Sequence, residues 1–297
     1  MRLSTVTAAM LAALAIATPL RAQSTLDTLP FDMKLQLAEA GDDQAQRAVG
    51  AAYEMGLEGV DIDPAEAADW YRRSADQGNV EAQYRLARLV HQGAEGLKAD
   101  PAEAAKLYEA AAGQGHLDAQ HWLGYVYERG EGVEQDGTKA VEWYRQAAEA
   151  GHPVAQNNLG LVFLSGKIVP RNLTRAFALF KQAAEQKDHW GLNNLAGMYE
   201  MGWGTQADKA RALELYRQAA ELGNPHALKN IARLEAASEQ TASGESGNDE
   251  PQEIGSEPQA TGDDPQGTDS QAPAADDAGE APTETAPDPE LPEPDPQ

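Results

Sequence analysis

The most constraining feature of the chain is a phrase that recurs along its first 225 residues. The phrase closes a short apolar pattern and appears as RRSADQGN, YEAAAGQGH, YRQAAEAGH, FKQAAEQKD and YRQAAELGN. Its turn position is occupied by Gly41, Gly78, Gly115, Gly151, Lys187 and Gly223, at spacings of 37 residues twice and then 36 residues three times. A fixed period of this length is typical of a solenoid, in which each unit packs only on its neighbours. Such an architecture favours a binding surface over a reaction centre.

Each unit contains two helical patterns. In the third unit, Ala119, Leu123 and Tyr127 recur at steps of four and predict one helix, after which Gly130 and Gly132 interrupt the pattern. A second stripe follows, formed by Ala140, Trp143, Tyr144, Ala147 and Ala148. Glycine in a left-handed conformation is expected to end this second helix at Gly151. The sequence therefore predicts an all-α fold of about five helix pairs.

Small and large residues alternate between the two helices. Small residues recur at two positions of the first helix (Ala45, Ala82, Ala119, Ala155, Gly191 and Ala227; Gly50, Ala87, Gly124, Gly160 and Ala196). Large residues of the second helix are expected to fill the interval, namely Trp70, Leu107, Trp143, Leu179 and Leu215. On this interpretation, Trp143→Ala would cost about 3–5 kcal/mol if Trp143 is buried.

Polar residues recur at the two helix starts. Asp63, Asp100, Asp136, Asn172 and Asp208 share a loop position and are expected to cap the second helices. His116, His152 and His189 are placed at the start of first helices, where other units carry Asn79 and Asn224. A capping role is the simpler interpretation of all these residues, and a metal site has little support because no histidine pairs with another at a helical spacing.

The N-terminus has the pattern of a secretory signal. Arg2 precedes a short apolar run, 6–17, and residues 20–22 form a cleavage site before Gln23. An uncleaved anchor or a buried helix is the alternative interpretation, but the run is shorter than the roughly 20 residues of a membrane span. Residues 1–22 are therefore predicted to be a signal peptide cleaved after Ala22, which places the mature protein in the periplasm or outside the cell.

The remaining boundaries follow from composition. Residues 23–40 are expected to form a capping helix, residues 41–237 the repeat solenoid with a closing helix from Pro225, and residues 238–297 a disordered tail. The tail contains seventeen of the 48 acidic residues and ten of the seventeen prolines, with no Lys or Arg. It has too few large apolar side chains to offset the entropy of ordering. Calcium binding, a basic partner, or solubility alone would each fit such a tail.

The repeat resembles the Sel1-like repeats, which are relatives of the tetratricopeptide repeats. The third unit carries the pattern most fully (Ala119, Leu123, Gly124, Tyr127, Gly130, Gly132, Val133, Asp136, Lys139, Ala140, Trp143, Tyr144, Ala147, Ala148 and Gly151). The resemblance covers about two thirds of the chain and implies a right-handed α-solenoid of antiparallel helix pairs with a concave face. It also implies protein–protein interaction, with some bacterial members acting as adaptors of membrane signalling proteins.

Several kinds of chemistry are disfavoured by the sequence. The chain has no cysteine, which excludes disulfides, thiolate metal sites and the cysteine-rich Sel1-like branch linked to β-lactams. Its net charge of −25 and its lack of a basic cluster argue against nucleic acid binding. No nucleophile motif, metal motif or phosphate loop stands out, so we predict a non-enzyme without metal or cofactor.

Candidate partner-binding residues lie on the first helices, at the positions that face inward in tetratricopeptide-like stacking. The predicted set is Tyr84, Arg88, His121, Tyr125, Asn157, Leu161, Trp190 and Asn193. These side chains vary chemically from unit to unit, and aromatic and amide groups can anchor a peptide and bond to its backbone. The alternative is that the aromatic residues only pack between units.

Three functions fit the sequence to different degrees. The preferred one is a non-catalytic scaffold that binds a protein or peptide on the concave face, outside the cytoplasm. The second is a periplasmic regulator that inhibits a membrane sensor by binding its outer domain. The third, a hydrolase of cell-wall or β-lactam substrates, lacks a recognisable nucleophile.

Overall fold

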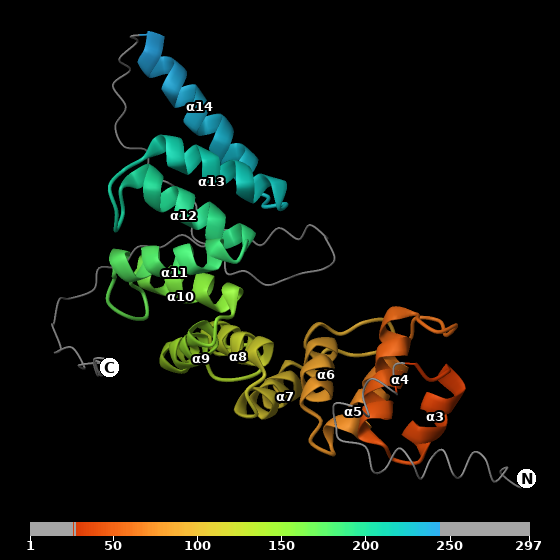
Figure 1. Cartoon of the computed structure of the whole chain (residues 1–297). Coiled ribbons are helices and arrows are strands. Elements are labelled where there is room, and N and C mark those ends of the chain that lie inside the picture. The colour runs from red at the N-terminus through yellow and green to blue at the C-terminus, as the bar shows by residue number, and fades with distance from the viewer. Residues whose placement is uncertain (1–25, 27, 244–297) are drawn as a thin grey trace, which may run out of the picture. The chain divides into compact units, whose positions relative to one another are not determined.

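A computed structural model describes Leu26 and residues 28–243, and regular structure in these residues is helical (Figure 1). The helices are α3 (Phe31–Glu39), α4 (Asp43–Met55), α5 (Pro64–Ala75), α6 (Val80–Gln92), α7 (Pro101–Gly113), α8 (Leu117–Arg129), α9 (Gly137–Glu149), α10 (Pro153–Ser165), α11 (Leu173–Glu185), α12 (His189–Met201), α13 (Lys209–Glu221) and α14 (Ala227–Ser243). The predicted signal peptide, residues 1–22, lies outside the described residues, as does the tail beyond Ser243.

The helices pack in sequence order. Each helix from α3 to α13 contacts the next one along the chain, and the first helices α10 and α12 also contact each other directly. The first helices are α4, α6, α8, α10 and α12, and their second helices are α5, α7, α9, α11 and α13. The chain thus forms an α-solenoid of five helix pairs, with α3 before the first pair and α14 after the last, as the period predicts.

Side-chain caps start the second helices at the predicted positions. Asp63, Asp100, Asp136, Asn172 and Asp208 each accept a hydrogen bond from a backbone N–H of the first helical turn. The turns after the second helices have positive φ at Gly78, Gly115, Gly151 and Gly223. Lys187 adopts the same conformation, with φ of 63°. This costs a residue with a Cβ atom about 1 kcal/mol.

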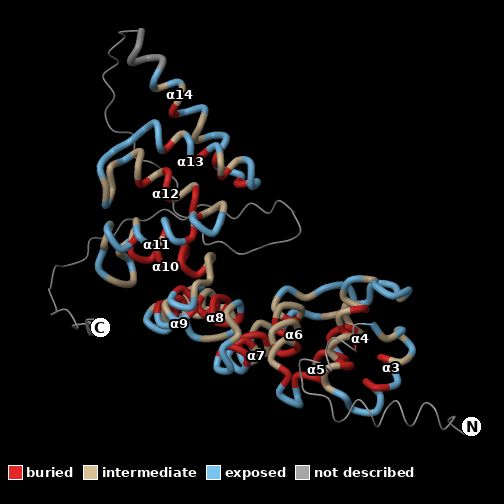
Figure 2. The backbone as a smooth tube through the Cα atoms, viewed as in Figure 1, coloured by how far each residue is buried: buried red, intermediate tan, exposed pale blue. Residues whose placement is uncertain are grey.

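The two helices of a unit meet where a ring lies over a small residue. A Cβ atom on Gly124 would come within 2.6 Å of the Tyr144 ring, and one on Gly160 within 2.7 Å of the Phe180 ring. The interval is therefore filled by Tyr71, Tyr108, Tyr144, Phe180 and Tyr216, all of them buried. Figure 2 shows that buried residues recur in each helix from α4 to α13. The prediction had assigned the interval to the preceding residue of each pair. Trp70 and Leu215 of that set are buried, whereas Leu107, Trp143 and Leu179 are only half-buried. Periodicity alone does not distinguish two adjacent large residues.

The hydroxyls of these buried tyrosines have partners on the first helix. Tyr71, Tyr144 and Tyr216 donate to Glu54, Glu128 and Glu200 at 2.5, 2.7 and 3.1 Å, and Tyr108 lies 3.5 Å from His91 Nδ1. In the fourth unit both positions are apolar, because Phe180 stands in place of the tyrosine and Leu164 in place of the carboxylate. Both members of the pair thus differ together between units, so that no unit buries a tyrosine hydroxyl without a partner.

A glutamine on each of four first helices bonds to the end of the helix before it. Gln46, Gln83, Gln120 and Gln156 donate to the carbonyls of Ala38, Ala75, Ala112 and Ala148. Three of these amides also accept a hydrogen bond from a glutamine after the second helix: Gln77, Gln114 and Gln186 donate at 2.8–2.9 Å. In the third unit Ala150 occupies the donor's position. Gln120 Oε1 is consequently buried without a hydrogen-bond partner among the described residues.

The loop of the fourth unit lacks the second loop glycine. In the third unit this glycine allows close approach, because a Cβ atom on Gly132 would lie 2.2 Å from the backbone of Pro101. In the fourth unit Ile168 takes the position and lies against Gly137, the first residue of α9. A Cβ atom on Gly137 would be 2.7 Å from Ile168 Cγ2. In this contact the small residue is therefore Gly137 at the start of the second helix, and the loop carries the large one.

The closing helix differs from its prediction at both ends. Pro225 and His226 form a turn, and Asn224 accepts hydrogen bonds from the backbone N–H groups of His226 and Ala227. The helix α14 therefore begins at Ala227 and continues to Ser243, past the predicted boundary at residue 237.

Candidate partner-binding surface

The structure divides the eight predicted binding residues into two groups. Five are half-buried, and we call them the first-helix surface: Tyr84, Arg88, Tyr125, Trp190 and Asn193. The other three are buried, with exposed fractions of 3% for His121, 0% for Asn157 and 8% for Leu161. These three side chains offer a partner almost no accessible surface. The prediction of partner contact is therefore withdrawn for them and stays a prediction for the first-helix surface.

The buried polar residues join consecutive first helices. Asn158 Nδ2 lies 3.0 Å from His121 Nε2, and Asn194 Nδ2 donates to Asn157 Oδ1 at 2.8 Å. Farther along, Asn230 donates to Asn193 at 3.0 Å, so Asn193 also has a structural role. Each bond spans 37 residues, which is one more than the local period. That recurring offset between polar residues is a signal in the sequence by which the contact between units could have been predicted, and the prediction from sequence missed it.

The buried imidazole of His121 is held in its neutral form. Burial is the main cause that lowers its pKa, to about 3. Its ring stacks on the ring of His152, with centroids 5.3 Å apart, and on that of Tyr144 at 6.0 Å. A neutral ring can accept the amide hydrogen of Asn158, whereas a protonated Nε2 cannot. The environment of His121 therefore fits a structural link and gives it no exposed basic nitrogen.

Two histidine caps also connect neighbouring units. His116 and His152 accept backbone N–H groups through Nδ1, and through Nε2 they meet Glu81 at 3.2 Å and Asp118 at 3.0 Å. The hydrogen bond from His116 is the largest cause that lowers the pKa of Glu81 to about 2. The bond from His152 likewise lowers the pKa of Asp118, against the opposing effect of its burial.

The predicted cap at His189 is wrong by one residue. Asp188 caps α12 and accepts from the backbone N–H of Gly191 at 2.6 Å, while His189 is the first helical residue. A step of 36 residues from the cap at His152 leads to Asp188. The prediction had chosen the neighbouring His189 because other units have a histidine at the helix start.

The first-helix surface is built from partly exposed rings. Tyr84 stacks on His116 with centroids 4.4 Å apart, and the guanidinium of Arg88 lies 6.0 Å from the Tyr84 ring. Burial raises the pKa of the Tyr84 hydroxyl to about 12, so the group is a neutral donor at physiological pH. Tyr125 packs edge-on against Trp122, and Trp190 lies between the rings of His189 and His226. Rings held in this way present apolar area and a few donors at little entropic cost.

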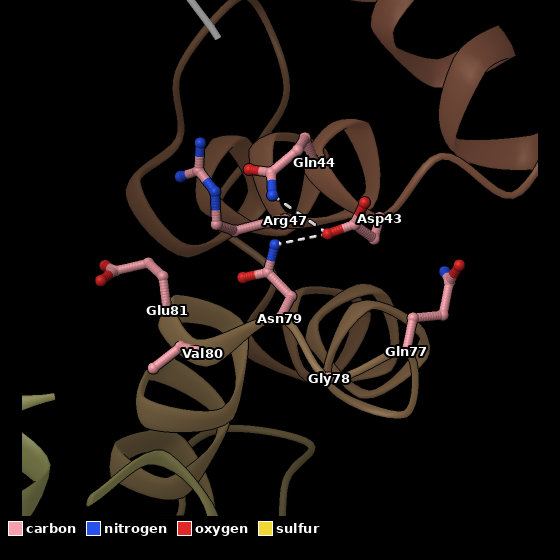
Figure 3. A pocket seen from close by; sticks show the side chains of 8 residues that line it. All are labelled: Asp43, Gln44, Arg47, Gln77, Gly78, Asn79, Val80 and Glu81. Atoms are coloured by element: carbon pink, nitrogen blue, oxygen red, sulfur yellow. Dashed lines mark hydrogen bonds between the residues drawn. The ribbon is translucent and has the colours of Figure 1, made fainter. Parts of the chain in front are cut away.

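A shallow hollow of about 470 Å³ lies where α4 and α6 begin (Figure 3). Asp43 accepts hydrogen bonds there from Asn79 at 2.8 Å and from Gln44 at 3.0 Å. The bond between Asp43 and Asn79 links the two units, while Gln77 and Glu81 bond to residues outside the lining. Its lining contains no serine, cysteine or histidine, and the arrangement offers no nucleophile.

Neither a metal cluster nor a membrane span emerges from the described part of the chain. Within residues 26 and 28–243, no group of three His, Asp or Glu side chains is placed to hold a metal ion. In the same residues, every helix is too short or too polar to cross a bilayer.

The Sel1 repeat family model matches five consecutive segments, at residues 43–79, 80–116, 117–152, 153–188 and 191–224. The chain belongs to the Sel1 repeat family. Its fold is similar to a Sel1 repeat protein from Oxalobacter formigenes, with 29% identity, a TM-score of 0.63, and coverage of 77% of this chain and 92% of that one.

A second solved structure is c5321, a protective antigen of uropathogenic Escherichia coli strains with an SLR fold. It is 30% identical with a TM-score of 0.53, and the match covers 75% of this chain. The chain spans about half the length of c5321, since 54% of that protein is covered. No curated protein matches the sequence in a direct comparison.

Membership in the Sel1 family explains the recurring residues of each unit. Sel1 repeats are generally protein-interaction scaffolds and typically not enzymes. The caps, turn glycines and buried rings recur in nearly every Sel1 unit of this chain, because each of them closes a helix or fills a helix contact. The units differ at the positions of the first-helix surface.

Proposed function

We propose that the chain is a non-catalytic scaffold that binds a protein or peptide partner through the first-helix surface, outside the cytoplasm. The observation that carries this proposal is the chemistry of Tyr84, Arg88, Tyr125 and Trp190. They are half-buried and chemically unlike the residues at the same positions of other units. Aromatic and arginine side chains of this kind dominate the binding energy of known interfaces.

The contacts of these residues support binding by preformed groups. Stacking of Tyr84 on His116, and the tilted contacts of Trp190 with His189 and His226, restrict these rings before a partner arrives. Pre-organised side chains lose less entropy on binding, which raises affinity for a given contact area. The first-helix surface is thus suited to an extended peptide with apolar side chains and free backbone carbonyls.

The proposal is tested with matched variants of the full chain. The mature protein is used to capture partners from an extract of its own source, and the captured protein is then titrated against purified variants. Arg88→Ala and Trp190→Ala should each weaken binding by about tenfold, as expected for interface residues of this type. Lys106→Ala, at an exposed position of α7, should leave the affinity unchanged.

Equal affinity of the Trp190→Ala, Arg88→Ala and Lys106→Ala variants would refute the assignment of this surface. Circular dichroism and the thermal midpoint of each variant must match the parent, so that a loss of binding is not a loss of folding.

The location outside the cytoplasm is a separate part of the proposal. It is supported by the charged start and the short apolar run of residues 1–22. N-terminal sequencing of the protein from the periplasmic fraction should find Gln23 as the first residue. A chain that begins at Met1 and fractionates with the cytoplasm would contradict it.

A further inference from the structure

The last helix, α14, lacks the second helix that covers the equivalent face of every preceding first helix. The pairs α4·α5, α6·α7, α8·α9, α10·α11 and α12·α13 form the closest contacts in the solenoid. In register, α14 is a sixth first helix, since Ala227 follows Ala155 and Gly191 at the same repeat position. No sixth second helix exists among the described residues.

The uncovered face of α14 is apolar. On the side of α10 that meets α11, Gly160 lies against the Phe180 ring and Gln156 accepts a hydrogen bond from Gln186, just past α11. Leu159, next to Gly160, is buried, and Leu164 follows one turn later. The same positions of α14 are Leu228, Ile231, Ala232 and Ala236, which we call the open face. Leu228 is 70% exposed, Ala232 and Ala236 are exposed, and Ile231 is half-buried. Exposed apolar residues in a row of this kind mark an interaction site.

The sequence after Ser243 lacks the pattern of a second helix. After Tyr216 the chain has no aromatic residue, and beyond Ser243 its only large apolar residues are Ile254 and Leu291. From Pro251 onward, successive prolines are at most nine residues apart, whereas each second helix is 12 or 13 residues long. Because proline breaks a helix beyond its first turn, this sequence predicts no second helix for the open face.

A second copy of the chain has no unpaired second helix to offer among its described residues. The second helices α5, α7, α9, α11 and α13 are each packed against the first helix before them and the one after them. A copy would have to unfold one of its own units to donate such a helix.

We propose that the open face of α14 binds an amphipathic helix from a partner protein, in the position of a sixth second helix. The face also defines the chemistry of that helix. Ala232 is at the repeat position of Ala87 and Ala196, whose units carry a buried tyrosine ring on the second helix. Ala236 stands where Glu54, Glu128 and Glu200 accept tyrosine hydroxyls, so the ring should be phenylalanine. Leu228 is at the repeat position of Gln156, and the fifth unit likewise has a leucine, Leu192, at this position. In that unit the residue after the second helix is Leu222 instead of glutamine, so a leucine is expected there in the partner helix.

The expected partner helix therefore has Phe, a small residue three positions later and Leu six positions later. Within this chain, Tyr216 and Ala219 of α13 and Leu222, which follows the helix directly, show that spacing. A peptide of residues 207–223 is thus a direct probe, because one substitution, Tyr216→Phe, gives the expected sequence. This site is separate from the first-helix surface and does not depend on the function proposed for it.

The test measures anisotropy of the labelled peptide with the full-length chain. The Tyr216→Phe peptide should bind saturably, the unsubstituted peptide more weakly, and the Tyr216→Ala peptide at least about tenfold more weakly. Ala232→Glu in the full chain should abolish binding, while Arg88→Ala and Trp190→Ala should leave it unchanged. Equal binding of the three peptides, or binding that survives Ala232→Glu, would overturn the proposal.

A short peptide is weakly helical on its own, so a linked version completes the test. In this chain, residues 238–259 are replaced by a copy of residues 202–223 that carries the phenylalanine. The thermal midpoint should rise by several degrees, and Ala232→Glu should cancel the gain; no rise would overturn the proposal. Light scattering of the parent chain tests whether a second copy of the chain occupies the open face. A dimer that dissociates in the Ala232→Glu variant would assign the open face to that second copy and overturn the proposal.

Discussion

The buried carbonyl of Gln120 should become a source of stability when Ala150 is replaced by glutamine. Gln120 Oε1 is buried without a partner among the described residues, because Ala150 stands where Gln77, Gln114 and Gln186 donate in other units. The backbone at Ala150, with φ of −77° and ψ of 2°, is close to that at Gln186, with φ of −89° and ψ of 8°. The new side chain can therefore adopt the geometry found in the fourth unit.

The magnitude follows from three contributions. An unsatisfied buried acceptor costs about 1–3 kcal/mol, and the new hydrogen bond removes that cost. Ordering the glutamine side chain opposes the gain by about 1–2 kcal/mol at most, and by less at a half-open site. A net stabilisation of about 1 kcal/mol is expected, which raises the thermal midpoint by about 2–4 °C in a chain of this size.

The assay combines thermal denaturation with hydrogen exchange, because a solenoid can open unit by unit. A gain of about 1 kcal/mol should slow exchange about fivefold in α8 and α9, with smaller changes elsewhere. Ala150→Glu is the matched control, since it has the same shape but no N–H to donate. Gln114→Ala should do the reverse and leave Gln83 Oε1 without its donor. Equal stability of the glutamine and glutamate variants would refute the reasoning.

Three further predictions concern single contacts. Burial lowers the pKa of His121 to about 3 in the fold, whereas a histidine in the unfolded chain has a pKa near 6.5. Lowering the pH from 7 to 5 should therefore reduce the free energy of unfolding by about 2 kcal/mol, and the His121→Asn variant should not show this loss. Equal pH slopes of parent and variant in denaturant titrations would exclude this. Lys187→Gly should stabilise the chain by about 0.5–1 kcal/mol, since Lys187 has a φ of 63°, and an unchanged or lower midpoint would count against strain there. Phe180→Tyr should cost about 1–3 kcal/mol by burying a hydroxyl next to Leu164, and adding Leu164→Glu should restore most of that loss in a double-mutant cycle; additive losses would show that the two side chains do not pair.

Much of the fold follows from the sequence because its stabilising contacts recur. The caps at Asp63 and its equivalents, and the left-handed turns at Gly78 and its equivalents, are local and depend only on nearby backbone. Their period was sufficient to predict both helices of each unit. The ends were less predictable, since no second helix follows α14 among the described residues and the limits of α14 depend on Asn224 and on residues past the last repeat.

The binding surface was harder to predict because burial there depends on the next unit. His121 and Asn157 lie at the same repeat position as Tyr84, yet the amides of Asn158 and Asn194 cover them. A single unit cannot show whether the following helix brings a polar partner to that position. Only the 37-residue offset between polar pairs distinguishes a structural link from a free side chain.

The most direct measurement of the proposed function is site-specific photo-crosslinking in living cells. Benzoylphenylalanine is placed at Tyr84 or Trp190 on the first-helix surface, and at Lys106 or Lys181 on exposed positions of second helices. The account predicts adducts with a partner protein from the first two positions and none from the second two. Adducts formed only from Lys106 and Lys181, with none from Tyr84 or Trp190, would contradict it.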